Sequence, residues 1–230
     1  MPAHIAVFDI NETTLDLAPV RATVVELLRD PLGFTVWFQK LLQLSMTVTA
    51  TDAYVDFSQL APAALETVFS SLGRTAPDDA WDRVAGAMSS IEPYPDVRPG
   101  LQRLREAGWT TLALTNSAPG QVHDHLERTG LAPLFDQVLS VDAVSAFKPA
   151  AAPYRYAAAQ VGVDPESTWM VACHDWDLAG ARAVGMSTAF VARAGMAYAT
   201  TYPAPTASVD GFEALAVELI TRSGDSGARS

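Results

Sequence analysis

The sequence predicts an α/β fold in which helices cover both faces of a parallel sheet and a helical segment is inserted after the first strand. Two observations predict it. Short apolar segments with the composition of strands alternate along the chain with segments of helical periodicity, which is typical of parallel sheets. The exception is residues 17–90, which contain helical patterns and no clear strand.

Five short segments rich in β-branched and other apolar residues are bounded by loops, and each predicts a strand. They are residues 5–10, 109–115, 137–141, 169–173 and 188–191. Helical patterns alternate with most of them, at residues 100–107, 118–129, 152–162, 177–184 and 211–220. Strands that alternate with helices are expected to lie parallel, with the helices packed on both faces.

The insertion is predicted to contain four amphipathic helices, at residues 19–28, 34–45, 54–72 and 78–89. The segment Glu92-Pro93-Tyr94-Pro95 marks the return to the sheet, because its prolines resist helix formation. We therefore expect a core domain of residues 1–16 and 91–222, a helical cap of residues 17–90, and a flexible Ser/Gly-rich tail of residues 223–230. An insertion at this point is well placed to exclude water from a site at the end of the sheet.

The composition indicates a soluble protein whose partner is a small molecule. Of 230 residues, 49% are hydrophobic, and 15 Lys and Arg against 26 Asp and Glu give a net charge of −11. This charge disfavours binding to nucleic acid and to anionic membranes. No apolar run approaches the ~18 residues of a membrane-spanning helix and no secretion signal is recognisable, so a cytoplasmic location is expected. The single cysteine, Cys173, excludes an intrachain disulfide and a Cys-based zinc cluster.

Polar residues follow four of the predicted strands at the ends where open α/β sheets carry their sites. A buried carboxylate such as that of Asp9 is costly unless it is paired or used, although an Asp can also simply cap a turn. The first strand end offers Asp9, Glu12 and Thr13, the second Thr115, Asn116 and Ser117, the third Lys148, and the fourth His174, Asp175, Trp176 and Asp177.

This order of motifs resembles the haloacid dehalogenase (HAD) superfamily, whose members carry Asp-x-x-x-Thr, Ser/Thr-Asn, Lys-Pro and an acidic cluster on a Rossmann-like sheet. The match extends over essentially the whole chain. Within the superfamily it is most similar to the L-2-haloacid dehalogenases (type II), through Tyr154 six residues after Lys148, through Trp176-Asp177, and through the helical insertion. The resemblance implies hydrolysis of short-chain L-2-haloalkanoic acids to 2-hydroxy acids without a metal or other cofactor. Dimers are common in this family, and a homodimer is left open here.

The resemblance also assigns roles to the residues at the strand ends. Asp9 is the expected nucleophile, which displaces the halide and forms an aspartyl ester. Lys148 is expected to hold Asp9 ionised and aligned, Asp177 to bind Lys148 or the water, and Tyr154 to hydrogen-bond near Lys148. Donors for the substrate carboxylate or the ester oxyanion are expected from Thr13, Thr115 and Asn116.

A substrate pocket with an apolar wall is expected beside Asp9, where it would desolvate the nucleophile and the carbon–halogen bond. Apolar residues at helical spacing are also typical of ordinary core, so the assignment depends on the motifs around them. The predicted lining is Asn11, Phe38, Gln39, Leu42, Phe57 and Trp176.

Two positions differ from the HAD phosphatases. Asn11 stands where phosphatases have an acid that protonates the leaving group, and Cys173 stands where they have a magnesium ligand. A halide leaves without a proton, so a dehalogenase loses nothing by the first change. The alternatives are a magnesium-dependent phosphatase that uses Asp9, Asp175 and Asp177, and a catalytically silent binding protein of the same fold.

Three positions differ from the familiar L-2-haloacid dehalogenases. Phe38 replaces an Arg that cradles the substrate carboxylate or halide, so we expect no guanidinium of the insertion in that role. His174 replaces an Asn, and Glu12 replaces a Gly. We predict that His174, oriented by Glu12, deprotonates the water that hydrolyses the ester. The alternative is that His174 only fills the space of the Asn while Glu12 is solvated.

Overall fold

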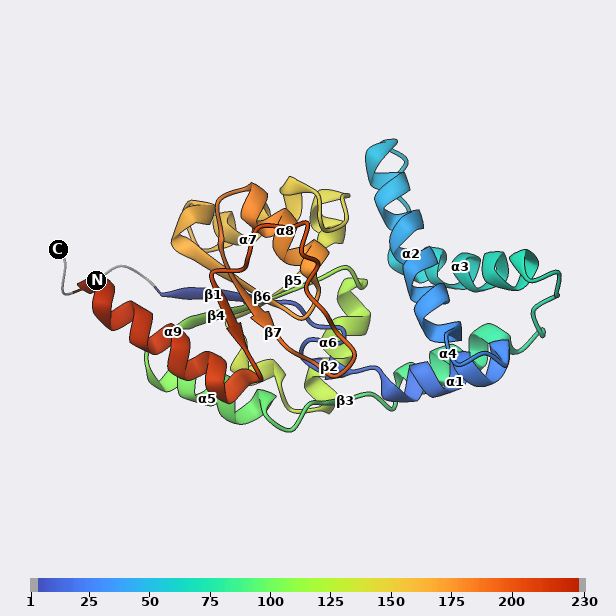
Figure 1. Cartoon of the computed structure of the whole chain (residues 1–230), viewed down its shortest axis with the longest axis horizontal. Coiled ribbons are helices and arrows are strands. Elements are labelled where there is room, and N and C mark those ends of the chain that lie inside the picture. The colour runs from blue at the N-terminus through green and yellow to red at the C-terminus, as the bar shows by residue number, and fades with distance from the viewer. Residues whose placement is uncertain (1–3, 228–230) are drawn as a thin grey trace.

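The computed structural model describes residues 4–227 and contains a parallel sheet of six strands (Figure 1). The strand order is β5-β4-β1-β6-β7-β8, so the first strand lies inside the sheet. The predicted fold class is confirmed, and within this sheet the sequence analysis missed one strand, the short edge strand β8. The strands are β1 (Ile5–Phe8), β4 (Thr110–Thr115), β5 (Gln137–Ser140), β6 (Thr168–Ala172), β7 (Ser187–Val191) and β8 (Ala207–Val209).

Helices pack on both faces of this sheet because its central strand is apolar on both sides. Ile5 and Val7 of β1 belong to one buried cluster, together with residues of α7 (Ala151–Gln160) and α8 (Asp175–Ala183). The alternate residues of β1, Ala6 and Phe8, belong to the cluster on the other face. That face is covered by α5 (Val97–Glu106), α6 (Pro119–Arg128) and α9 (Phe212–Gly227).

The helical insertion lies at one end of the sheet, to the right in Figure 1. Its helices are α1 (Ala18–Leu28), α2 (Gly33–Ala50), α3 (Phe57–Ser71) and α4 (Ala80–Met88). The chain leaves and re-enters the core through β2 (Leu15–Asp16) and β3 (Glu92–Pro93), which pair antiparallel and hold the two ends of the insertion together. Within residues 4–227, no helix has both the length and the apolar character needed to cross a membrane.

Several element boundaries differ from the prediction for local reasons. The helix expected from residue 54 begins at Phe57, because the Asp56 side chain accepts a hydrogen bond from the Ser58 amide and caps the helix there. The helix expected at residues 34–45 continues to Ala50. The last helix, expected to end at residue 220, runs to Gly227, so the segment predicted as a flexible tail begins in helical conformation; residues 228–230 lie outside the described part.

Candidate active site

The sheet brings the predicted polar residues together at the carboxyl ends of three adjacent strands. Asp9 follows β1 directly, Thr115 ends β4, and His174 lies two residues beyond β6. Strand β1 pairs with β4 on one side and with β6 on the other. Because parallel strands end at the same edge of a sheet, residues far apart in the sequence meet around Asp9.

Asp9 is held by two short hydrogen bonds in a nearly water-free position. Its side chain is 7% exposed, and one oxygen, Oδ1, lies 2.7 Å from the Lys148 ammonium. The other oxygen, Oδ2, accepts a hydrogen bond of 2.6 Å from the Thr13 hydroxyl. Thr14 donates to the Asp9 carbonyl at 2.7 Å and so fixes the backbone. The carboxylate therefore has one orientation before any ligand binds.

Lys148 is buried and its ammonium group has three acceptors. It lies 2.7 Å from Asp9 and from Asp177, and it donates to the Leu114 carbonyl at 3.1 Å. Burial alone would lower the pKa of Lys148, but the two carboxylates outweigh it and raise the pKa above its ordinary value. The lysine therefore stays an ammonium ion beside Asp9.

Asp177 lies behind Lys148, away from the cavity. Burial raises the pKa of Asp177 against the opposing effect of Lys148, because one ammonium faces two carboxylates and the excess negative charge is poorly solvated. The Tyr154 hydroxyl donates to Asp177 at 2.6 Å, and burial raises the pKa of Tyr154 well above its usual value. Asp177 binds Lys148, one of the two roles predicted for it. Tyr154 hydrogen-bonds Asp177, which is itself bonded to Lys148, as expected, and it is not among the residues that line the cavity against Asp9.

Thr13 lies behind the Asp9 carboxylate, on the side away from the cavity. Its hydroxyl donates to Asp9 and accepts a hydrogen bond of 2.9 Å from the Cys173 amide. The side chain is fully buried and does not line the cavity against Asp9. Of the two roles predicted for this hydroxyl, its bond to a carboxylate oxygen of Asp9 favours donation to the ester oxygen over contact with the substrate carboxylate.

A small cavity of about 20 Å³ lies against Asp9. Asn116 is fixed there because its side-chain oxygen accepts a hydrogen bond of 3.1 Å from the Lys148 amide. Asn11 is fixed by a bond of 3.0 Å from its side-chain amide to the Ser117 hydroxyl. Most of the residues predicted to form the substrate pocket do line it. The lining is Asp9, Asn11, Phe38, Leu42, Phe57, Thr115, Asn116, Lys148, His174 and Trp176.

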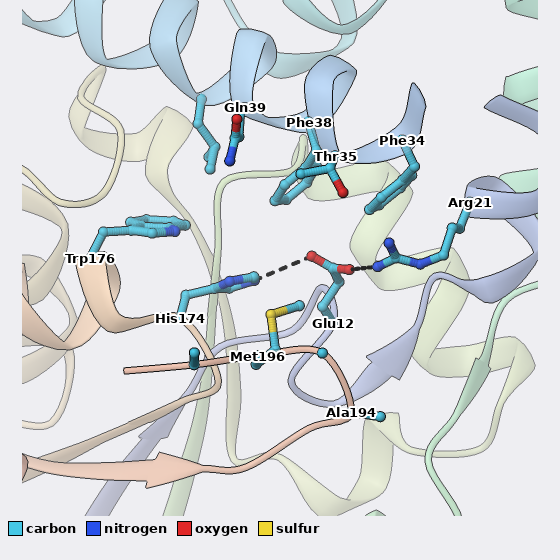
Figure 2. Close-up of a pocket in the computed structure, with 13 residues that line it drawn as sticks. Glu12, Arg21, Phe34, Thr35, Phe38, Gln39, His174, Trp176, Ala194 and Met196 are labelled. Carbon is cyan, nitrogen blue, oxygen red and sulfur yellow. Dashed lines mark hydrogen bonds and ion pairs between the residues drawn. The ribbon is translucent and has the colours of Figure 1, made fainter. Parts of the chain in front are cut away.

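A larger cleft of about 340 Å³ adjoins this nucleophile cavity, between α2 and the loop after β7 (Figure 2). The two spaces share four side chains, Phe38, Leu42, His174 and Trp176. Gln39 lines the cleft but not the nucleophile cavity, so it is further from Asp9 than predicted. The cleft provides a route from solvent to the shared wall of aromatic and imidazole rings.

Glu12 and His174 lie side by side at this wall. His174 Nε2 is 3.8 Å from Glu12 Oε2, 4.0 Å from Asp9 Oδ2 and 3.3 Å from the Asn11 carbonyl oxygen. The His174 ring stacks between Phe38, at 6.0 Å, and Trp176, at 5.3 Å between ring centroids. Burial raises the pKa of Glu12, against the opposing effects of His174 and Arg21. The two residues predicted as a dyad therefore face each other, at a separation longer than a direct hydrogen bond.

Sequence reasoning missed two arginines around the nucleophile loop. Arg21 of α1 donates to Glu12 Oε1 at 2.6 Å and lines the outer cleft, so the insertion does supply a guanidinium there, although not from position 38. Arg193, two residues after β7, donates to the Thr13 carbonyl at 2.9 Å and pairs with Asp96. Arg21 lies on an amphipathic helix, and nothing in the local sequence marks it as a site residue. Arg193 follows a predicted strand closely, and that position could have identified it as a candidate site residue.

The acidic residues of the fourth motif do not fit a magnesium site. Both carboxylate oxygens of Asp175 accept hydrogen bonds from backbone amides, those of Trp176 and Ala199, at 2.7 and 3.1 Å. Those of Asp177 are taken by Lys148 and Tyr154. Within the described part of the chain, no three His, Cys, Asp or Glu side chains are grouped so that they could hold a metal ion. The alternative role of Asp175 as a plain loop residue agrees with these contacts.

Several proteins that are similar to this chain in sequence and in fold are named as dehalogenases. The chain is 32% identical over 197 residues to (S)-2-haloacid dehalogenase 1 of Pseudomonas sp. (strain CBS-3), covering 84% of this chain and 86% of that one. The solved L-2-haloacid dehalogenase of Xanthobacter autotrophicus superposes with a TM-score of 0.82 at 27% identity, covering 94% of this chain and 97% of that one. The same enzyme with chloropropionic acid covalently bound gives a TM-score of 0.80, again at 27% identity and with the same coverage. A family model described as haloacid dehalogenase-like hydrolase matches residues 4–185, and the chain belongs to this family.

Proposed function

We propose that this protein hydrolyses short-chain L-2-haloalkanoic acids to 2-hydroxy acids through an ester formed on Asp9. The observation that carries the proposal is the carboxylate of Asp9, which lies 2.7 Å from the Lys148 ammonium at the wall of a small, mostly apolar cavity. Relatives named as (S)-2-haloacid dehalogenases support the same reaction class.

The first step is an in-line displacement at the α-carbon. A carboxylate oxygen of Asp9 forms a bond to this carbon, and the halide leaves with the electron pair of the carbon–halogen bond. No proton moves, so Asn11 at the position of the phosphatase acid is no handicap. Phe38, Leu42 and Phe57 supply apolar contacts that keep water from the nucleophile.

The second step is hydrolysis of the ester. Because His174 Nε2 is 4.0 Å from Asp9 Oδ2, a water molecule about 3 Å from each would fit between the imidazole and the ester carbonyl. His174 takes a proton from this water, and the hydroxide attacks Cγ of Asp9. The tetrahedral intermediate then expels the 2-hydroxy acid as an alkoxide, which receives the proton from His174. Asp9 is released as a carboxylic acid, and it returns to a carboxylate when it gives the second proton of the water to His174, which passes it to solvent.

Glu12 orients the imidazole in this scheme. Its carboxylate lies 3.8 Å from Nε2, and it supports the position of the ring and favours the imidazolium that forms when the ring takes the proton of the water.

The test is halide release from a panel of chloro- and bromo-substituted 2-haloacids, with EDTA and with added magnesium. We expect release that is indifferent to both additions and absent in Asp9→Asn. A single turnover in H₂¹⁸O should place the label in Asp9, because hydroxide attacks the ester carbonyl rather than the substrate carbon. Magnesium-dependent turnover of a phosphate ester would instead support a phosphatase, and inactivity on both substrate classes would support a silent binding protein.

A further inference from the structure

Arg21 makes a shorter contact to Glu12 than His174 does, and the proposed reaction assigns Arg21 no role. The guanidinium donates to Glu12 Oε1 at 2.6 Å, whereas His174 is 3.8 Å from Oε2. Figure 2 shows Arg21 and His174 approaching the Glu12 carboxylate from opposite sides. Glu12 is thus the middle member of a row of three charged or titratable groups.

The backbone of Glu12 is in a conformation that its side chain does not favour. Its φ is +63°, in the left-handed region where residues other than glycine are strained. The Glu12 amide donates to the Leu15 carbonyl at 2.9 Å, which fixes this tight turn. Strain of this kind persists where the surrounding structure enforces it, and it is frequently associated with function. The Glu12 side chain is moreover only 4% exposed, so it is not a solvated surface group.

Arg21 is not explained by the stability of its own helix. It is the fourth residue of α1, close to the amino end, where the helix dipole disfavours a cation. Its guanidinium lies 4.1 Å above the ring of Phe34 of α2, which restricts its position. Arg21 therefore connects two helices of the insertion to the nucleophile loop of the core.

We propose that Arg21 is a positioning residue for ester hydrolysis: it holds the Glu12 carboxylate ionised and turned toward His174, and so couples the position of the helical insertion to activation of the water. This inference rests on the proposed function. Displacement of the halide needs only Asp9 and Lys148, so Arg21 should leave that step alone. Hydrolysis needs the oriented imidazole, so it should depend on Arg21.

The charged surroundings of Glu12 agree with this role. His174 and Arg21 favour the Glu12 carboxylate, whereas Asp9 and burial oppose it. Two further titratable groups, the buried Cys173 and the half-buried Tyr94, also interact electrostatically with Glu12. Removal of the Arg21 cation should therefore raise the pKa of Glu12 further, and the carboxylate should be lost at a higher pH.

The test compares Arg21→Gln and Arg21→Lys with Arg83→Gln. Arg83 pairs with Glu26 at 2.7 Å elsewhere in the insertion and is similarly exposed, so it controls for the loss of an ion pair. Rapid-quench halide release measures displacement, and decay of the Asp9 ester in intact-protein mass spectra measures hydrolysis. We expect Arg21→Gln to keep the halide burst and to slow ester decay about ten- to a hundred-fold. Arg21→Lys should restore part of the rate, and Arg83→Gln should behave as the parent.

The pH profile separates a positioning role from a structural one. In Arg21→Gln the acidic limb of ester decay should move to higher pH, and a ¹³C NMR titration of Glu12 should move in the same direction. In a variant that already carries Glu12→Gln, Arg21→Gln should slow ester decay little further, because both substitutions remove the same contact.

Each contrary outcome has its own meaning. An unchanged rate of ester decay in Arg21→Gln overturns the inference while the dehalogenase reaction stands. A raised KM with unchanged ester decay also overturns it and makes Arg21 a substrate-binding residue. If the parent protein releases no halide, the proposed function fails. In that case the NMR titration still tests the contact by itself: an unchanged Glu12 pKa in Arg21→Gln would show that Arg21 does not influence the Glu12 carboxylate.

Discussion

The two charged clusters around Asp9 differ in how tightly they are built. The nucleophile cluster, Asp9, Lys148, Asp177 and Tyr154, lies within the core, and its contacts are 2.6 to 2.7 Å long. The hydrolysis cluster, Glu12, His174 and Arg21, spans the core and the insertion, and His174 stands 3.8 and 4.0 Å from its carboxylate neighbours. Arg21 is also 45% exposed, whereas Lys148 is 1% exposed.

This difference matches the demands of the two proposed steps. Displacement needs a carboxylate held in one orientation, and a dry, fully hydrogen-bonded cluster provides that. Hydrolysis needs room for a water molecule and a base whose protonation changes during the cycle. Loose contacts near a solvent-connected cleft suit such a base better than a closed network would.

Removal of His174 should give the largest effect, and it tests whether the two clusters serve separate chemical steps. Because displacement requires no base, His174→Ala should release one burst of halide per active site and leave an adduct on Asp9. Subsequent hydrolysis should slow by on the order of a hundred- to ten-thousand-fold. Rapid-quench halide release from 2-chloropropionate and intact-protein mass measure the two steps, and the exposed His123 provides the control His123→Ala.

Two results of that experiment would contradict the division into clusters. If neither burst nor adduct forms, His174 serves the displacement or the fold. If His174→Ala turns over like the parent, another group activates the water, and Asp177 is the first to examine.

Tyr154→Phe tests how much the hydrogen bonds of the nucleophile cluster contribute to the free energy of unfolding. The change removes the hydroxyl that donates to Asp177 at 2.6 Å in a fully buried site, so the free energy of unfolding should fall by about 1–3 kcal/mol. Urea denaturation measures it. Tyr156→Phe on the same helix, at a less buried position, should have no comparable effect. Equal losses in the two variants would mean that the bond to Asp177 is not what stabilises the cluster.

Phe38→Ala tests the wall that the two clusters share. Phe38 stacks on His174 and on Phe34 of α2, and its ring lines both the nucleophile cavity and the outer cleft. Loss of the ring should raise KM about ten-fold with a smaller change in kcat, because apolar contact is lost while Asp9 and His174 remain. Val36→Ala, at an exposed position of the same helix, is the control. Unchanged kinetics in Phe38→Ala would remove Phe38 from the substrate pocket.

Glu12→Gln should slow ester decay at least as much as Arg21→Gln does, and it should also have a diagnostic effect on pH dependence. Burial raises the pKa of Glu12 above the ordinary value of 4.5, so its carboxylate is lost as the pH falls through a value higher than that. Ester hydrolysis in the parent should therefore decline on that acidic limb, and Glu12→Gln should remove the limb and slow the step less than His174→Ala. The rate of ester decay as a function of pH measures both effects. If the rate of ester decay in Glu12→Gln still declines at low pH, a group other than Glu12 causes that decline.

The same shift predicts the sign of a stability effect. Because the folded protein binds the Glu12 proton more tightly than the unfolded chain, the contribution of this group to stability falls as the pH rises from the ordinary value through the raised one. Urea midpoints of the parent and of Glu12→Gln across that interval measure the contribution. A contribution that instead grows with pH would contradict the raised pKa.

The sequence by itself determined the fold class and most of the nucleophile cluster. Alternation of strands and helices predicts a parallel sheet, and a parallel sheet places the residues after β1, β4 and β6 at one edge. Asp9, Lys148 and Asp177 were identifiable because their order and spacing along the chain resemble the motifs of the haloacid dehalogenase superfamily. The short strand β8 was missed because three residues, Ala-Ser-Val, carry too little pattern to distinguish a strand from a loop.

Only the tertiary structure decided which way the side chains face and which unmarked residues reach the site. Thr13 and Tyr154 follow the family pattern, yet both lie behind the catalytic groups, because Asp9 and Asp177 use their hydroxyls. Arg21 stands on an ordinary amphipathic helix, and nothing local distinguishes it from a solvated arginine. Its contact with Glu12 depends on where the insertion rests against the core, and packing between distant segments leaves no periodic signal in the sequence.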